Sequence, residues 1–194
     1  MGDYNYHIFL SYKRGGAVEE WVKNLFYPLL KKWLNEELPY EPDIYFDQNM
    51  RAGTEWPSEI KNALKTTRIL VPILNSKYFS SSWCKAEFST LSEREKLFLP
   101  NKITLIYPIR FHDGKYFTDH IENRLYFDMG EYSSTCLAFK ESSNYILFER
   151  SVKKVAAELA ELISKAPEYN NNWPIISPQE DNSSGDIPIP KSSY

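Results

Sequence analysis

The strongest constraint on the fold is a nearly unbroken apolar run at residues 69–74, Ile-Leu-Val-Pro-Ile-Leu. A strand with both faces buried gives such a run, whereas a strand with one wet face alternates apolar and polar residues. Asn75 and Ser76 follow with turn-favouring side chains. We therefore expect a buried parallel strand, which needs crossover helices to reach its neighbours.

Strand-like and helix-like segments alternate along the first 109 residues. Apolar residues recur at helical spacing over residues 17–38, 54–64 and 83–99. The β-prone runs occupy residues 7–11, 43–46, 69–74 and 103–109, and Pro108 suggests the end of the last one. This order predicts an α/β fold, with a parallel sheet and helices on both faces.

The remaining sequence predicts less regular structure. Residues 111–124 indicate an irregular or partly helical stretch, 125–127 a short edge strand and 145–165 a final amphipathic helix. From Pro167 onward, Asn, Ser and Pro dominate and little apolar area can be buried. We predict one domain over residues 1–166 and a loosely ordered tail over 167–194, in which Trp173 could dock on the body or on a partner.

Composition excludes several classes of function. A net charge of -3 and a pI near 5.7 argue against a nucleic-acid partner. The sequence holds neither an apolar run of the ~20 residues that span a bilayer nor a signal peptide, so we expect a cytoplasmic protein without a membrane partner. Cys84 and Cys136 have no zinc-type spacing, and His112 and His120 lack a carboxylate geometry, so no metal is expected.

Trp83 and Glu87 are the most informative functional candidates. A helix places residues four apart on one face, so an indole and a carboxylate share a surface. That surface follows the buried run 69–74, near the carboxyl end of its strand. In open α/β sheets, this edge is where ligands bind.

Three motifs, in this order, resemble those of the TIR (Toll/interleukin-1 receptor) domain family. Residues 6–12, Tyr-His-Ile-Phe-Leu-Ser-Tyr, resemble its opening strand. Residues 45–47, Tyr-Phe-Asp, with 51–53, Arg-Ala-Gly, resemble its second strand and BB loop, and 82–87, Ser-Trp-Cys-Lys-Ala-Glu, its third-helix motif. The resemblance covers about residues 5–165 and implies a flavodoxin-like five-stranded parallel sheet with helices on both faces.

The TIR family contains both assembly modules and enzymes that cleave the nicotinamide-ribose bond of NAD+. In the enzymes, the carboxylate that matches Glu87 is essential, and a Trp four residues earlier, here Trp83, is typical of bacterial members. A TIR domain standing almost alone resembles prokaryotic defence proteins of the Thoeris kind, which make cyclic ADP-ribose isomers or related nucleotides during phage infection. The resemblance implies NAD+ as a substrate, no bound cofactor, and a nucleotide-sensing effector downstream.

The chemistry of this bond suits a carboxylate. Nicotinamide leaves as a neutral molecule, and the difficulty is the positive charge that develops on the ribose, which Glu87 could offset. The alternative for Glu87 is a solvated helix glutamate. Trp83 could stack on nicotinamide or adenine, or it could close the helix against the sheet.

Other candidates follow the ends of the predicted strands. Lys13 and Arg14 suit a pyrophosphate, although a basic pair on a loop is often only solvated surface. Asp47 could bind ribose or hold the BB loop, and Ser76 and Tyr78 could contact ribose or be ordinary polar loop residues.

Two further features complete the candidate site. Gly15 and Gly16 could offer backbone N–H groups to an anion. Cys84 is not expected to be a nucleophile, because the nearby Glu87 carboxylate would raise its pKa.

Two competing functions stay open. The chain could be a non-enzymatic adaptor that self-associates through TIR-TIR contacts, including the BB loop at residues 48–53, and this role can coexist with catalysis if a neighbouring TIR domain completes the site. It could also be another flavodoxin-like enzyme, such as a nucleoside deoxyribosyltransferase, which places a glutamate at a glycosidic bond. The spacing of Trp83 and Glu87 and the strand at residues 6–12 favour a TIR domain.

Overall fold

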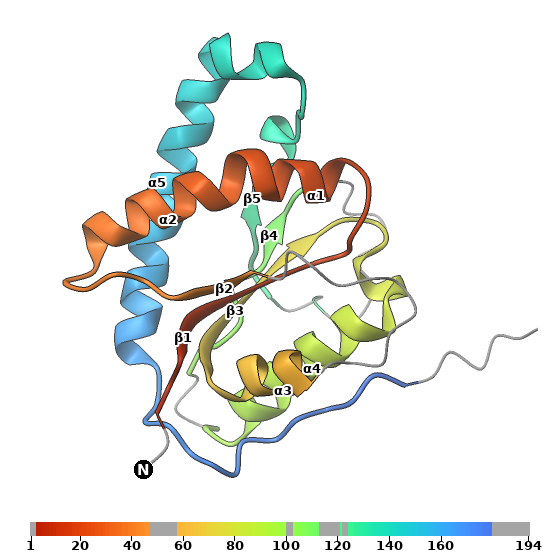
Figure 1. Ribbon diagram of the computed structural model, residues 1–194, viewed down its shortest axis with the longest axis vertical. Helices are drawn as coiled ribbons and strands as arrows, with labels where there is room; N and C mark the ends of the chain where they lie inside the picture. The colour runs from red at the N-terminus through yellow and green to blue at the C-terminus, as the bar shows by residue number, and fades with distance from the viewer. Residues whose placement is uncertain (1–2, 47–57, 100–102, 113–120, 122–123, 180–194) are drawn as a thin grey trace, which may run out of the picture.

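A computed structural model describes residues 3–46, 58–99, 103–112, 121 and 124–179. A parallel five-stranded sheet with strand order β2-β1-β3-β4-β5 forms its centre (Figure 1). The strands are β1 (Tyr6–Tyr12), β2 (Ile44–Phe46), β3 (Thr67–Leu74), β4 (Ile109–Arg110) and β5 (Phe127–Asp128). This sheet confirms the predicted flavodoxin-like α/β fold, whose connections reverse direction between β1 and β3.

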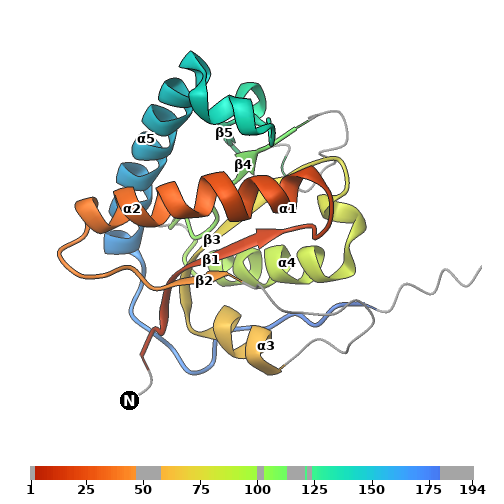
Figure 2. The ribbon, with the colours of Figure 1, turned by 45° about the horizontal axis from the view of Figure 1, so that its top comes forward.

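Helices cover both faces of the sheet. The α-helices are α1 (Ala17–Trp21), α2 (Tyr27–Glu37), α3 (Ser58–Lys65), α4 (Ser82–Lys96) and α5 (Ser143–Lys165). Short 3-10 helices are η2 (Tyr78–Ser80), η4 (Gly130–Tyr132) and η5 (Leu137–Glu141). Helices α1, α2 and α5 lie on one face, and α3 and α4 on the other (Figures 1 and 2).

The predicted helix over residues 17–38 contains a π-helical turn, η1 (Val22–Phe26), between α1 and α2. Pro28 stands at the start of α2 and has no N–H to donate to the carbonyl four residues earlier. A wider turn just before Pro28 accommodates that missing bond. The apolar stripe continues through the turn, because Val22, Leu25 and Phe26 are buried.

The fourth strand differs from its prediction. Pro108 was expected to end a strand over residues 103–109, but β4 begins after this proline, and Ile106 makes only an isolated bridge to β3. The backbone N–H groups of Leu105 and Ile106 donate instead to the Glu95 carboxylate of α4, at 2.7 and 3.1 Å. A contact from a distant helix, together with a residue that cannot donate, therefore breaks the strand.

The C-terminal segment, residues 167–179, packs against the domain, in contrast to the loose tail that its composition predicts. Trp173 is buried, with its ring centre 5.0 Å from the Arg94 guanidinium carbon and 5.8 Å from the Phe98 ring centre. The Ile176 N–H donates to the Thr90 hydroxyl at 3.0 Å. Residues 180–194, the rest of the predicted tail, lie outside the described residues.

None of the helices in the described part of the chain has the length and apolarity that a bilayer crossing requires.

Candidate active site

Glu87 lies on the inner side of α4 and reaches the sheet. Its Oε2 accepts a hydrogen bond from the Ser11 hydroxyl at 2.5 Å, and Ser11 Oγ lies 2.7 Å from the Tyr78 hydroxyl. The exposed fractions are 7% for Glu87, 2% for Ser11 and 0% for Tyr78. The interpretation of Glu87 as a solvated helix glutamate is therefore wrong.

The fold brings these residues to the carboxyl end of two adjacent strands. Ser11 is the penultimate residue of β1 and pairs with Pro72 of β3. Tyr78 opens η2, which follows β3, and Glu87 stands in the second turn of α4. The cluster thus lies between β1 and β3, where ligands bind in flavodoxin-like sheets.

Helix α4 starts at a fixed place because its first turn is capped. Ser81 has extended backbone, and its hydroxyl accepts from the Cys84 N–H at 3.4 Å. Such a cap satisfies one of the free N–H groups at a helix start. The cap therefore stabilises the first turn of α4, just before the turn that carries Glu87.

Burial keeps the neighbouring groups protonated. It is the main cause that raises the pKa of the Cys84 thiol, and the Glu87 charge adds to it, while Lys13 and bonds from Ser81 and Ser11 act against it. Burial likewise raises the pKa of Tyr78 well above its ordinary value. The prediction that Cys84 is no nucleophile is supported, although its main cause is desolvation rather than the carboxylate.

The loop after β1 holds the two basic candidates. Lys13 and Arg14 are half-buried, and the Lys13 charge acts to lower the pKa of the Cys84 thiol. Gly15 and Gly16 have φ of 89° and 72°, a region that favours glycine. The Gly15 N–H donates to the Glu19 carboxylate at 2.7 Å, so a bound anion would have to displace that side chain.

The other residues predicted to contact a ligand differ in exposure. Trp83 is half-buried and packs at the edge of the core, which leaves part of its ring accessible. Ser76 is exposed on the loop after β3, whereas Tyr78 is fully buried, so the prediction that Tyr78 contacts ribose is wrong. Asp47 and the BB loop at residues 48–53 lie outside the described residues.

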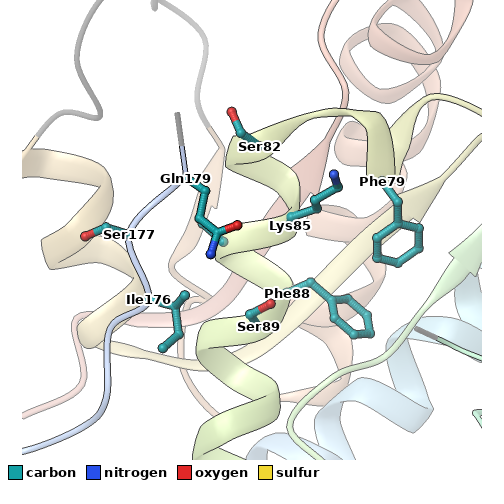
Figure 3. A pocket seen from close by; sticks show the side chains of 9 residues that line it. Phe79, Ser82, Lys85, Phe88, Ser89, Ile176, Ser177 and Gln179 are labelled. Carbon is teal, nitrogen blue, oxygen red and sulfur yellow. The ribbon is translucent and has the colours of Figure 1, made fainter. Parts of the chain in front are cut away.

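A cavity of about 240 Å³ lies on another face of α4, partly covered by the C-terminal segment (Figure 3). Its lining consists of Phe79, Ser82, Lys85, Ala86, Phe88, Ser89, Ile176, Ser177 and Gln179. Glu87 does not contribute, because its position on the helix turns it toward β1 instead. This cavity is therefore separate from the carboxylate cluster.

Within the described residues, no three His, Cys, Asp or Glu side chains gather closely enough to hold a metal ion. Of the two histidines considered for a metal, His120 lies outside the described residues.

Sequence reasoning missed the role of Ser11. The sequence contains a pattern that could have identified this residue, because Ser11 is polar and directly follows the apolar run of β1, Ile8-Phe-Leu10. A buried polar group needs a partner, and this requirement points to a contact across the fold.

The fold and the cluster define an α/β protein with a carboxylate at the switch point of a flavodoxin-like sheet. The TIR domain family model matches residues 8–140, more than half of the 194 residues, and the chain belongs to the TIR domain family. No curated protein matches the chain. Among solved structures, the chain is similar to the TIR domains of the activated Roq1 resistosome directly recognizing the pathogen effector XopQ. Identity is 20%, coverage is 78% of this chain and 84% of that one, and the TM-score is 0.43.

Proposed function

We propose that this TIR domain cleaves the nicotinamide-ribose bond of NAD+. The products are nicotinamide and ADP-ribose, or a cyclic or conjugated derivative of it that acts as a signal in antiviral defence. The observation that carries the proposal is the Glu87 carboxylate, which Ser11 holds at the β1–β3 switch point of the sheet. Burying a carboxylate costs free energy, and here that cost falls at the edge of the sheet where ligands bind.

The proposed reaction uses this carboxylate to stabilise charge. The bond between ribose C1′ and the pyridinium nitrogen breaks, and its electron pair leaves with neutral nicotinamide. Positive charge then develops on the ribose, and Glu87 offsets it through hydrogen bonds with ribose hydroxyls that strengthen in the transition state. A nucleophile then adds to C1′: water gives ADP-ribose, a hydroxyl or ring nitrogen of the substrate itself gives a cyclic product, and an external acceptor gives a conjugate. A water or hydroxyl nucleophile releases its proton in this step.

Neighbouring residues have proposed binding roles. Lys13 and Arg14, at the end of β1, contact the pyrophosphate, and the accessible part of Trp83 stacks on a heteroaromatic ring. Ser76 and Asp47 contact ribose. The proposed reaction needs no metal or resident cofactor. We propose that the protein acts in the cytoplasm.

Association between copies is part of the same proposal. A neighbouring TIR domain, contacting the BB loop at residues 48–53, completes the site, and a nucleotide-sensing effector reads the product. Activity per molecule then rises with protein concentration, which a fixed-concentration assay would miss.

The decisive experiment compares Glu87→Gln with the unchanged protein across a concentration series, with mass spectrometry of the NAD+ products. Glutamine preserves shape, which matters because Glu87 is buried and Glu87→Ala would leave Ser11 without its acceptor. We expect nicotinamide release to fall by about 100-fold or more.

The matched control is Glu93→Gln. Glu93 stands on the same helix, but its side chain is 43% exposed and pairs with Lys96 on the surface. We expect normal release from this variant. Equal release by Glu87→Gln and the unchanged protein would overturn the catalytic proposal and favour the adaptor function.

A further inference from the structure

Three buried side chains from separate elements form a chain of hydrogen bonds. Ser11 of β1 stands between Tyr78 of η2 and Glu87 of α4, at 2.7 and 2.5 Å. The Tyr78 side chain has no exposed surface, and its hydroxyl is linked to Glu87 through Ser11.

With Glu87 ionised, as the proposed function requires, the number of available protons fixes the direction of both bonds. An ionised carboxylate only accepts, so the single proton of the Ser11 hydroxyl goes to Glu87 Oε2. Ser11 then has no proton left for Tyr78, and the Tyr78 hydroxyl must donate to Ser11 Oγ. Tyr78 can do this at any physiological pH, because burial raises its pKa and keeps the phenol protonated.

The other polar groups around the chain do not reverse this order. The Cys84 thiol stands near Ser11, Ser81 and Glu87, and the charge of Lys13 reaches it from the loop after β1. A thiol is a weak donor and a weak acceptor, so the carboxylate takes the Ser11 proton in preference.

We propose that Tyr78 and Ser11 are positioning residues that orient the Glu87 carboxylate through a two-step hydroxyl relay, Tyr78 to Ser11 to Glu87. The inference rests on the proposed function and deepens it. Each bond polarises the next inside the buried cluster, and Tyr78 also fixes the Ser11 rotamer. The relay therefore contributes to turnover without contacting NAD+.

The test is a double-mutant cycle in NAD+ cleavage with Ser11→Ala, Tyr78→Phe and both together. We expect Ser11→Ala to lower kcat by roughly 10- to 100-fold, because it removes a bond to a charged group. Tyr78→Phe should lower kcat by about 3- to 10-fold with KM unchanged. The double variant should match Ser11→Ala, because Tyr78 acts only through Ser11.

The matched control is Tyr107→Phe. Tyr107 donates to the Glu158 carboxylate of α5 at 2.5 Å, so it is also a tyrosine-glutamate pair, away from the cluster. Its removal should leave kcat unchanged. Unchanged kcat in Tyr78→Phe, or additive losses in the double variant, would overturn the relay.

A second readout separates the relay from the proposed function. In protein labelled with ¹³C at glutamate side chains, Glu87→Gln identifies the Glu87 carboxyl resonance. We expect Tyr78→Phe to shift this resonance and Tyr107→Phe to leave it in place. If the unchanged protein cleaves no NAD+, the proposed function fails while this shift still supports the relay; an unmoved resonance overturns the relay whether or not NAD+ is cleaved.

Discussion

Helix α4 carries two buried charges, roughly two turns apart, whose surroundings differ. Glu87 lies at the carboxyl end of the strands and bonds to a side-chain hydroxyl of β1. Arg94 lies near the opposite edge, where its guanidinium donates to the backbone carbonyls of Thr67 and Leu64 at 2.8 and 2.9 Å. Within one helix, Glu87 is therefore bonded to a side chain and Arg94 to the main chain.

Under the proposed function, Glu87 is the charge that serves the reaction and Arg94 is the charge that holds the fold. Main-chain carbonyls cannot be replaced by mutation, so Arg94 ties α4 to the end of α3 and the start of β3 whatever the neighbouring side chains are. Burial lowers the pKa of Arg94 to about 10, which still leaves it charged at neutral pH. Glu87 instead bonds to the side-chain hydroxyl of Ser11, which a single substitution can remove.

The largest effect that tests this contrast is expected for Arg94→Met. Two buried carbonyls lose their donors, so the free energy of unfolding should fall by about 3 kcal/mol, measured by urea denaturation. Glu87→Gln should change it by less than about 1 kcal/mol. The exposed Arg150→Met is the control, with a change within about 0.5 kcal/mol. Equal losses of unfolding free energy for Arg94→Met and Arg150→Met would show that Arg94 has no special structural role.

A smaller effect is expected for Trp173→Ala, which removes the buried ring that covers Arg94. The free energy of unfolding should fall by about 2 kcal/mol from lost apolar burial. Amide hydrogen exchange at Ile176, whose N–H is bonded to Thr90, should become faster, because the C-terminal segment opens locally. Unchanged protection at Ile176 would show that this segment is held without Trp173.

The smallest effect is expected for Thr90→Val, which keeps the shape but leaves the Ile176 N–H without its acceptor. A loss of about 1 kcal/mol should lower Tm by about 2–4 °C in a thermal melt. Cleavage of NAD+ should not change, because the Thr90 hydroxyl bonds to the backbone of Ile176 in the C-terminal segment. A fall in kcat would mean that the C-terminal segment also positions Glu87.

Local pattern predicted most of the fold, since helical spacing and apolar runs are properties of neighbouring residues. It failed at β4, where the Glu95 carboxylate of a distant helix takes two N–H groups from the predicted strand. The same limit applies to the site. The spacing between Trp83 and Glu87 pointed to the carboxylate. Its buried hydrogen bond, however, comes from Ser11, 76 positions earlier in the chain, and no local pattern contains that contact.

The two cysteines of the chain differ in exposure. Cys136 is exposed, whereas Cys84 is buried against Ser11 and Glu87. Oxidants reach an exposed thiol more easily than a buried one, so we expect oxidation of Cys136 before the thiol beside the carboxylate. The packing around Glu87 therefore also shields the Cys84 thiol from oxidants.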